Sequence, residues 1–150
     1  MNRPQSPVAR PTRHRAVTVV AALAACIATV ASAADWPKFK PGQWQFDRSI
    51  EGTSPQPQKL SKVECVDPTE KNRQQRAMLT QAGCQFTPVV EKGSTYTYSA
   101  TCKVGGMSST SRSTLVVDGN EAYTVTIDSE TDGVKTHEVL TARRLGDCPK

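Results

Sequence analysis

The stretch CQFTPVVEKGSTYTYSATC, residues 84–102, begins and ends with cysteine and carries strand-forming residues on both sides of a central turn. Its two halves, 85–90 and 95–101, are rich in β-branched and aromatic residues, which favour strands. If Cys84 faces Cys102 across an antiparallel ladder, their Cα atoms lie roughly 4.5 to 5.5 Å apart, within reach of a disulfide bond. The stretch therefore predicts a hairpin that a disulfide holds in register.

This pairing decides which residues of the hairpin share a face. Phe86 would lie opposite Ala100, and Val90 opposite Tyr96. Pro88 falls within the first of the two strands. Because proline has no N–H to donate to a ladder, that strand is expected at the edge of a sheet.

Further strands are predicted on both sides of the hairpin. Trp44, Phe46 and Ile50 share one face of an alternating segment near the mature start. Strands are predicted at residues 43–50, 60–65, 108–117, 122–128 and 134–145. The Asp-Gly-Asn turn between the third and fourth of these strands would place Leu115 opposite Tyr123.

One helix is predicted between the first two cysteines of the mature chain. Asp67 is a good N-cap, Pro68 suits the first helical position, and Gly83 is placed to end the helix. Together with the strands, this predicts a mainly β (α+β) fold, an antiparallel β meander of about six strands with one helix near 68–82. A barrel-like closure of the sheet is left open.

Residues 1–33 have the form of a cleaved secretory signal peptide. A basic head precedes an apolar run that ends in the small residues ASA at 31–33. Cleavage between Ala33 and Ala34 would leave one domain, 34–150, with no transmembrane segment. Cys26 offers an alternative, because LAAC at 23–26 has the form of a bacterial lipobox, whose cysteine would anchor a lipoprotein to the membrane.

Removal of the leader would take away most of the positive charge. The chain has 19 basic and 14 acidic residues, and four of the arginines lie in the leader, so 15 basic and 14 acidic residues remain. The high isoelectric point therefore belongs to the export signal. It does not indicate nucleic acid or an anionic membrane as a partner.

Four cysteines follow the leader, namely Cys65, Cys84, Cys102 and Cys148. An even number of cysteines in a small exported domain predicts disulfides, and no C-x-x-C pair suggests zinc. A helix of about 15 residues would hold Cys65 roughly 22 Å from Cys84. The predicted bonds are therefore Cys84–Cys102 and Cys65–Cys148.

No catalytic constellation stands out beyond the leader. His137 is the one histidine there, on a predicted strand whose face it shares with Lys135 and Val139, and it is interpreted as a surface residue. No metal or cofactor site is predicted. Tyr96 and Tyr98 share a face, which could serve ligand stacking, although packing is the commoner use of such a pair.

Three features of the sequence are similar to a known family: KPGQW at 40–44, the paired Cys84 and Cys102, and RLGDC at 144–148. Over about residues 40–148 the chain resembles the domain-of-unknown-function 3617 family of small exported bacterial proteins. Members often carry a Met/Pro-rich stretch where this chain has GTSPQPQ, so metal binding by methionines is not implied. The resemblance implies an envelope protein and supplies no catalytic residues.

Export and disulfides, without a catalytic constellation, favour a non-catalytic binding or structural role in the cell envelope, either periplasmic or secreted. The expected partner is an envelope protein, a cell-wall component or a small apolar ligand. Two alternatives are a secreted hydrolase inhibitor that presents the loop at 52–59, and a small envelope hydrolase that uses His137. An enclosed apolar cavity would favour a ligand carrier.

Overall fold

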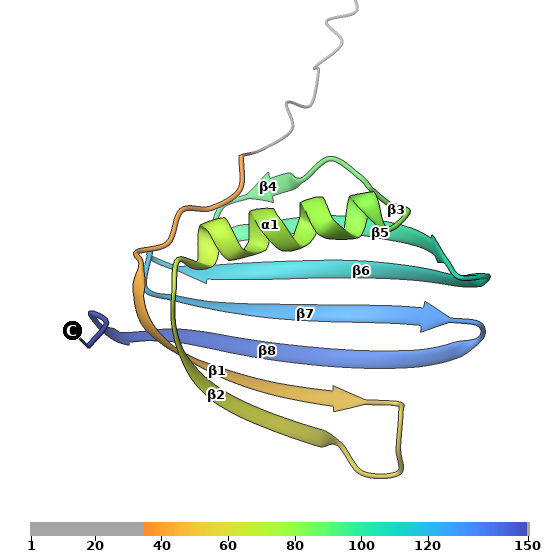
Figure 1. Cartoon of the computed structure of the whole chain (residues 1–150), viewed down its shortest axis with the longest axis horizontal. Coiled ribbons are helices and arrows are strands. Elements are labelled where there is room, and N and C mark those ends of the chain that lie inside the picture. The colour runs from red at the N-terminus through yellow and green to blue at the C-terminus, as the bar shows by residue number, and fades with distance from the viewer. Residues whose placement is uncertain (1–34, 150) are drawn as a thin grey trace, which may run out of the picture. The chain divides into compact units, whose positions relative to one another are not determined.

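A computed structural model describes residues 35–149 of the chain (Figure 1). Within these residues lie eight strands and one helix. They are β1 (Gly42–Glu51), β2 (Gln58–Val66), α1 (Pro68–Gln81), β3 (Cys84–Phe86), β4 (Val90–Lys92), β5 (Thr95–Val104), β6 (Met107–Asp118), β7 (Ala122–Thr131) and β8 (Val134–Gly146). The mainly β fold with one helix is confirmed. The predicted leader, with Cys26, Ala33 and Ala34, lies outside the described residues.

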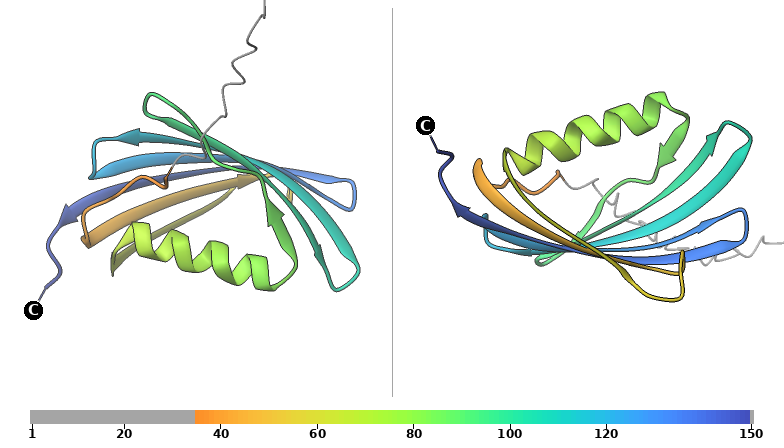
Figure 2. Two further views of the ribbon diagram at one scale, coloured as in Figure 1. Left: turned by 90° about the horizontal axis from the view of Figure 1, so that it is seen from above. Right: turned by 60° about the horizontal axis from the view of Figure 1, so that its bottom comes forward.

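All strands belong to one antiparallel sheet in the order β2-β1-β8-β7-β6-β5-β3, and β4 also pairs with β5. The expected meander runs from β5 to β8. The hairpin of β1 and β2 joins it through β8, the last strand in the sequence. The sheet is curved but does not close, and α1 lies over its concave side (Figure 2). The structure thus has eight strands where about six were predicted, and no barrel.

Residues 84–102 fold as β3, β4 and most of β5. Cys84 pairs with Cys102, and Phe86 pairs with Ala100, as predicted. The predicted pairing of Val90 with Tyr96 is wrong, because Val90 pairs with Thr97.

The cause of this difference is an interruption at residues 87–89. Pro88 cannot donate to the ladder, and the strand breaks there into β3 and β4. A shift of one residue moves side chains to the other face of a sheet. Val89 is therefore buried at 8 % exposure, whereas Val90 is 58 % exposed.

The β6–β7 hairpin also differs in register from the prediction. Leu115 pairs with Val125, not with Tyr123, because Asp118 still belongs to the ladder and pairs with Ala122. The three-residue loop thus begins one position later than predicted. The partner of each β6 residue is therefore displaced by two positions along β7. Because two is an even number, the apolar faces of the two strands still meet.

The buried core fills one end of the concave face. Trp44 and Leu115 are fully buried at its centre. The other members of this cluster are Phe39, Phe46, Tyr123 and Ala142. Ring centroids of Phe39 and Tyr123 are 4.6 Å apart, and those of Trp44 and Tyr123 are 5.8 Å apart. This aromatic packing fixes β1 against β6, β7 and β8.

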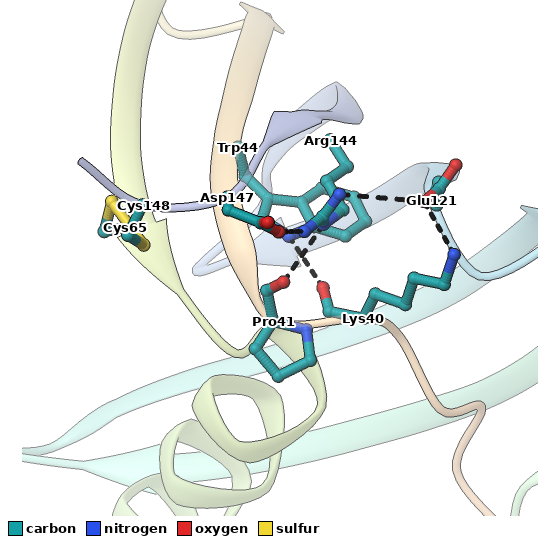
Figure 3. Close-up of polar contacts among 8 residues, drawn as sticks. All are labelled: Lys40, Pro41, Trp44, Cys65, Glu121, Arg144, Asp147 and Cys148. Atoms are coloured by element: carbon teal, nitrogen blue, oxygen red, sulfur yellow. Dashed lines mark hydrogen bonds and ion pairs between the residues drawn. A yellow bond between two sulfur atoms is a disulfide. The ribbon is translucent and has the colours of Figure 1, made fainter. Parts of the chain in front are cut away.

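A set of contacts that we call the terminal clamp joins the segment before β1 to the end of β8 (Figure 3). The indole of Trp44 donates to the carbonyl oxygen of Lys40 at 3.0 Å. The Arg144 guanidinium donates to the carbonyl oxygen of Pro41 at 3.0 Å and also bonds to Asp147. Lys40 in turn pairs with Glu121 at 2.9 Å.

Gly42 has a steric reason to be glycine in this clamp. A Cβ atom at this position would overlap the carbonyl oxygen of Gly146 and the guanidinium of Arg144. The two sequence motifs at 40–44 and 144–148 therefore meet as one packing unit.

The four cysteines of the described chain are bonded in two pairs. Cys65 is joined to Cys148, with Cα atoms 5.6 Å apart, beside the terminal clamp (Figure 3). Cys84 is joined to Cys102, with Cα atoms 4.0 Å apart, at the start of β3.

Helix α1 begins as its capping residues predict. The Asp67 carboxylate accepts from the backbone N–H groups of Thr69 and Glu70, and Pro68 stands at the first helical position. The helix ends at Gln81, followed by Gly83 with a positive φ of 104°.

We predict that Leu115→Ala lowers the free energy of unfolding by about 2–5 kcal/mol, because it leaves a cavity in the core. Val116→Ala on the opposite face, where Val116 is 44 % exposed, should cost less than about 1 kcal/mol. Urea denaturation measures both. Equal costs would contradict the assignment of the two faces.

We also predict that the protein, purified without a reductant, carries both disulfides, which peptide mapping without reduction would identify. Loss of Cys65–Cys148 should destabilise the fold by about 4 kcal/mol and loss of Cys84–Cys102 by about 3 kcal/mol, because the first closes the longer loop. Four free thiols, or another pairing, would show that the prediction is wrong.

Candidate functional site

Helix α1 has few apolar residues with which to cover the sheet. Its sequence PTEKNRQQRAMLTQ contains only Ala77, Met78 and Leu79 as apolar side chains after the initial proline, and Met78 points outward at 62 % exposure. Pro68 is the one buried residue of the helix. A helix that presents polar residues to a sheet cannot close an apolar core with it.

A cleft of about 1240 Å³ therefore separates α1 from the concave face of the sheet. We call it the helix–sheet cleft. Its apolar and aromatic lining consists of Trp36, Phe46, Leu60, Ala77, Leu79, Phe86, Pro88, Val89, Tyr98, Tyr123, Val125, Ile127 and Leu140. The helix contributes Thr69, Asn72, Gln75, Arg76 and other polar residues. The cleft thus has a mostly apolar floor and a mostly polar roof.

The floor continues the core along the sheet. Val125 pairs with Leu140 across β7 and β8, and Ile127 follows Val125 on the same face. All three side chains are only half-buried, unlike the core residues beside them. Apolar surface left in contact with water forgoes about 25 cal/mol per Å² of stabilisation. A ligand that covers this floor would recover that free energy.

Ion pairs connect the helix to the edge of the sheet at one end of the cleft. Lys62 and Lys71 both bond to Glu64, and hydrogen bonds from Lys71 and Lys62 lower the pKa of this carboxyl group. Both ammonium groups also lie over the ring of Phe46, at 5.7 and 5.2 Å from its centre. These contacts hold α1 near β2 without filling the cleft.

Arg76 reaches from the middle of α1 to the aromatic side chains of β3 and β5. Its guanidinium carbon lies 4.3 Å from the ring centre of Phe86 and 5.5 Å from that of Tyr98. One terminal nitrogen donates to the carbonyl oxygen of Thr87 at 3.2 Å. The other, Nη1, is buried and has no hydrogen-bond acceptor among the described residues.

Trp36 supplies a second buried donor beside Tyr98. The two rings meet edge-on, with centroids 5.6 Å apart. The indole Nε1 of Trp36 has no acceptor in the described part of the chain. A buried N–H that lacks an acceptor costs about 1–3 kcal/mol. The cleft therefore contains two donors that the protein itself leaves unsatisfied.

Tyr123 lies where the core meets the cleft. Burial raises the pKa of its phenol to about 12, opposed in part by a hydrogen bond to Asn72. Tyr123 is therefore neutral at physiological pH. The two tyrosines of β5 both lie on the concave face: Tyr98 lines the cleft, and Tyr96 packs against the core with its hydroxyl bonded to Glu91 at 2.8 Å.

His137 lies on the opposite, convex face and does not line the helix–sheet cleft. Its Nδ1 lies 2.7 Å from a carboxylate oxygen of Asp128 on β7. A second hollow, of about 670 Å³, is lined by this pair and by residues of β1, β5, β6, β7 and β8. No serine or threonine hydroxyl of residues 35–149 bonds to His137, so a complete Ser-His-Asp arrangement is not formed there.

Of the cleft residues, the sequence pointed only to Tyr98 as a residue that could serve ligand stacking. Arg76, Trp36 and Ile127 come from three separate segments, and only the tertiary fold brings them to one site. The one signal that could have pointed to the cleft is the composition of the predicted helix, which has too few apolar residues to cover a sheet. Among residues 35–149, no group of three or more His, Cys, Asp or Glu side chains is arranged to hold a metal ion. Within the same range, no helix has the length and apolar character needed to cross a membrane.

We predict that the pKa of His137 lies above its ordinary value of 6.5, because a hydrogen bond to Asp128 and the charges of Asp128 and Glu51 favour the imidazolium. A raised pKa stabilises the fold fully at pH values below the pKa of the unfolded state. This contribution is lost as the pH rises through the pKa of the folded state. Titration by NMR, with the signal assigned by its absence in His137→Gln, measures the pKa. Asp128→Asn should lower it, and Glu51→Gln, which removes only a neighbouring charge, should lower it less. An identical pKa in all three proteins would refute this account.

Residues 39–148, which make up 110 of the 150 residues, match the family described as "Protein of unknown function (DUF3617)". Neither a curated protein nor a solved structure matches the chain. The family match spans every strand and the helix, from the terminal clamp to the last cysteine, and it agrees with the resemblance seen in the sequence. The chain thus belongs to the DUF3617 family.

Proposed function

We propose that this protein is an exported, non-catalytic binding protein that holds a small apolar molecule in the helix–sheet cleft. The observation that carries the proposal is the half-buried apolar floor at Val125, Ile127 and Leu140 beneath a polar helix. Ligand sites in proteins are typically concave and mostly apolar, with a few polar groups that orient the ligand. The helix–sheet cleft has this composition.

The chemistry of the floor selects among the candidate partners. A cell-wall component is rich in hydroxyl and amide groups, which would be desolvated without acceptors or donors against Val125 and Ile127. A protein partner would need an exposed surface, whereas this floor is roofed by α1. A small apolar molecule fits between the two layers, and the volume of about 1240 Å³ exceeds the roughly 300–1,000 Å³ of sites for drug-sized ligands.

Export supports the proposal from the sequence side. The leader-like residues 1–33 and the even number of cysteines after them are typical of a protein that works outside the cytoplasm. An apolar molecule crossing the aqueous periplasm needs a carrier that shields it from water. A disulfide-bonded domain with a preformed cleft is suited to that task.

We predict that the purified protein binds the neutral fluorescent probe N-phenyl-1-naphthylamine, and that Ile127→Trp weakens this binding at least about tenfold because the larger ring fills the cleft. The matched control is Thr126→Trp, the next residue along β7, whose side chain points to the convex face. Fluorescence titration measures the affinity, and urea denaturation checks that both variants are folded.

Organic extraction of the protein from the periplasm, followed by mass spectrometry, would identify a ligand that copurifies with it. Failure of the wild-type protein to bind the probe, together with extracts that contain nothing, would reject the proposed function. Equal loss of binding in Ile127→Trp and Thr126→Trp would show that the probe binds elsewhere.

A further inference from the structure

The basic residues that line the helix–sheet cleft differ in whether the chain supplies a counter-charge. Arg48 pairs with Glu138 at 2.6 Å, and Arg73 pairs with Glu70 at 2.7 Å. Lys62 and Lys71 share Glu64. Among the described residues that line the cleft, Arg76 is the one cation without an ion pair.

The surroundings of Arg76 make this missing counter-charge costly. The guanidinium lies against the rings of Phe86 and Tyr98, and its Nη1 is shielded from water. Buried charges in proteins are normally paired or fully hydrogen-bonded. Cation–π contact with the rings offsets part of the desolvation but provides no acceptor for the Nη1 protons.

The indole Nε1 of Trp36 also lacks a hydrogen-bond acceptor, and the Trp36 ring lies beside the same tyrosine. Trp36 and Arg76 both contact Tyr98, so two unsatisfied donors, one of them cationic, border a single tyrosine at the wall of an apolar cleft. A carboxylate or phosphate group accepts several hydrogen bonds at once, and its negative charge would compensate the positive charge of Arg76. A neutral hydroxyl or amide head group would supply an acceptor without the charge.

We infer that the ligand of the helix–sheet cleft is an anionic amphiphile, whose acidic head group binds Arg76 and Trp36 and whose apolar tail lies on the floor formed by Val125, Ile127 and Leu140. This inference rests on the proposed function and specifies its ligand. The planar guanidinium fork suits a carboxylate or phosphate, and its carbon lies 4.3 Å from the ring centre of Phe86 at the wall of the cleft. Fatty acids and phospholipid-like molecules share this chemistry.

The test compares three ligands that have the same twelve-carbon tail: dodecanoate, dodecyl phosphate and dodecanol. Each ligand is titrated against the protein as it is purified from cells. Binding is measured by displacement of N-phenyl-1-naphthylamine at low and at physiological salt. We expect the wild-type protein to bind one or both anionic ligands at least about tenfold more tightly than dodecanol. A preference for the carboxylate over the phosphate, or the reverse, distinguishes a fatty acid from a phosphate-bearing lipid as the source of the head group.

Three variants assign the preference to its residues. Arg76→Gln should abolish the anion preference by weakening the two anionic ligands far more than dodecanol, and Trp36→Phe, which keeps the ring but removes the N–H, should weaken anion binding by a few-fold. Arg143→Gln is the matched control, because it removes an exposed cation of β8 that does not line the helix–sheet cleft. It should leave the preference intact.

The outcomes separate this inference from the proposed function. Equal binding of dodecanol and both anions by the wild-type protein would overturn the inference and leave the binding function standing. So would an anion preference that survives Arg76→Gln, or one that Arg143→Gln removes equally. Failure of all three ligands and of the neutral probe would overturn both. Urea denaturation of each variant ensures that the comparison is made between folded proteins.

Discussion

The pairing of β1 with β8 is the interaction on which the rest of the structure depends. It joins the N-terminal hairpin to the C-terminal end of the meander, and the terminal clamp fixes it where Arg144 donates to the carbonyl oxygen of Pro41. Without this pairing, Trp44 and Phe46 would have no partners on β6 and β7, and the concave face would lose its buried end. The disulfide between Cys65 and Cys148 lies beside the same junction, so a covalent bond and a set of polar contacts secure the two ends of the domain together.

The terminal clamp also explains the sequence features that identify the family. Lys40, Pro41, Gly42 and Trp44 meet Arg144, Gly146 and Asp147 as one unit with a structural role. Each residue type has a packing or hydrogen-bonding reason, such as the close approach of Gly42 to the backbone at Gly146. These residues lie at the buried end of the sheet, while the half-covered floor of the helix–sheet cleft lies further along it. In this chain, these residues thus serve the assembly of the domain, and the proposed ligand is argued from the cleft.

The helix–sheet cleft follows from a mismatch between its two layers. The concave face offers a continuous apolar floor, but the helix above it presents Thr69, Asn72 and Arg76. The mismatch leaves Val125, Ile127 and Leu140 half-covered, and it leaves the Arg76 guanidinium among aromatic rings without a counter-charge. An anionic amphiphile would satisfy both layers, because its tail is complementary to the floor and its head group to Arg76. The curvature of the open sheet provides the room for such a ligand.

The sequence by itself determined the features that depend on neighbouring residues. Alternation placed Trp44 and Phe46 on one face, Asp67 and Pro68 marked the start of the helix, and the cysteine spacing suggested the pairs that the structure brings together. The family, the fold class and most strand positions followed from these local patterns. The shift of Val90 and the later start of the β6–β7 loop escaped prediction because register depends on which backbone groups find partners across strands.

Only the tertiary structure decided that the sheet stays open, that β1 lies beside β8, and that a cleft remains beneath α1. Trp36, Arg76 and Tyr98 come from an N-terminal segment, a helix and a strand, and no spacing in the sequence connects them. The sequence could therefore raise Tyr98 as a stacking residue, but it could not assemble the candidate site. The physical reason is that hydrophobic burial and charge compensation act between residues that are neighbours in space, whereas a sequence pattern reports only on neighbours along the chain.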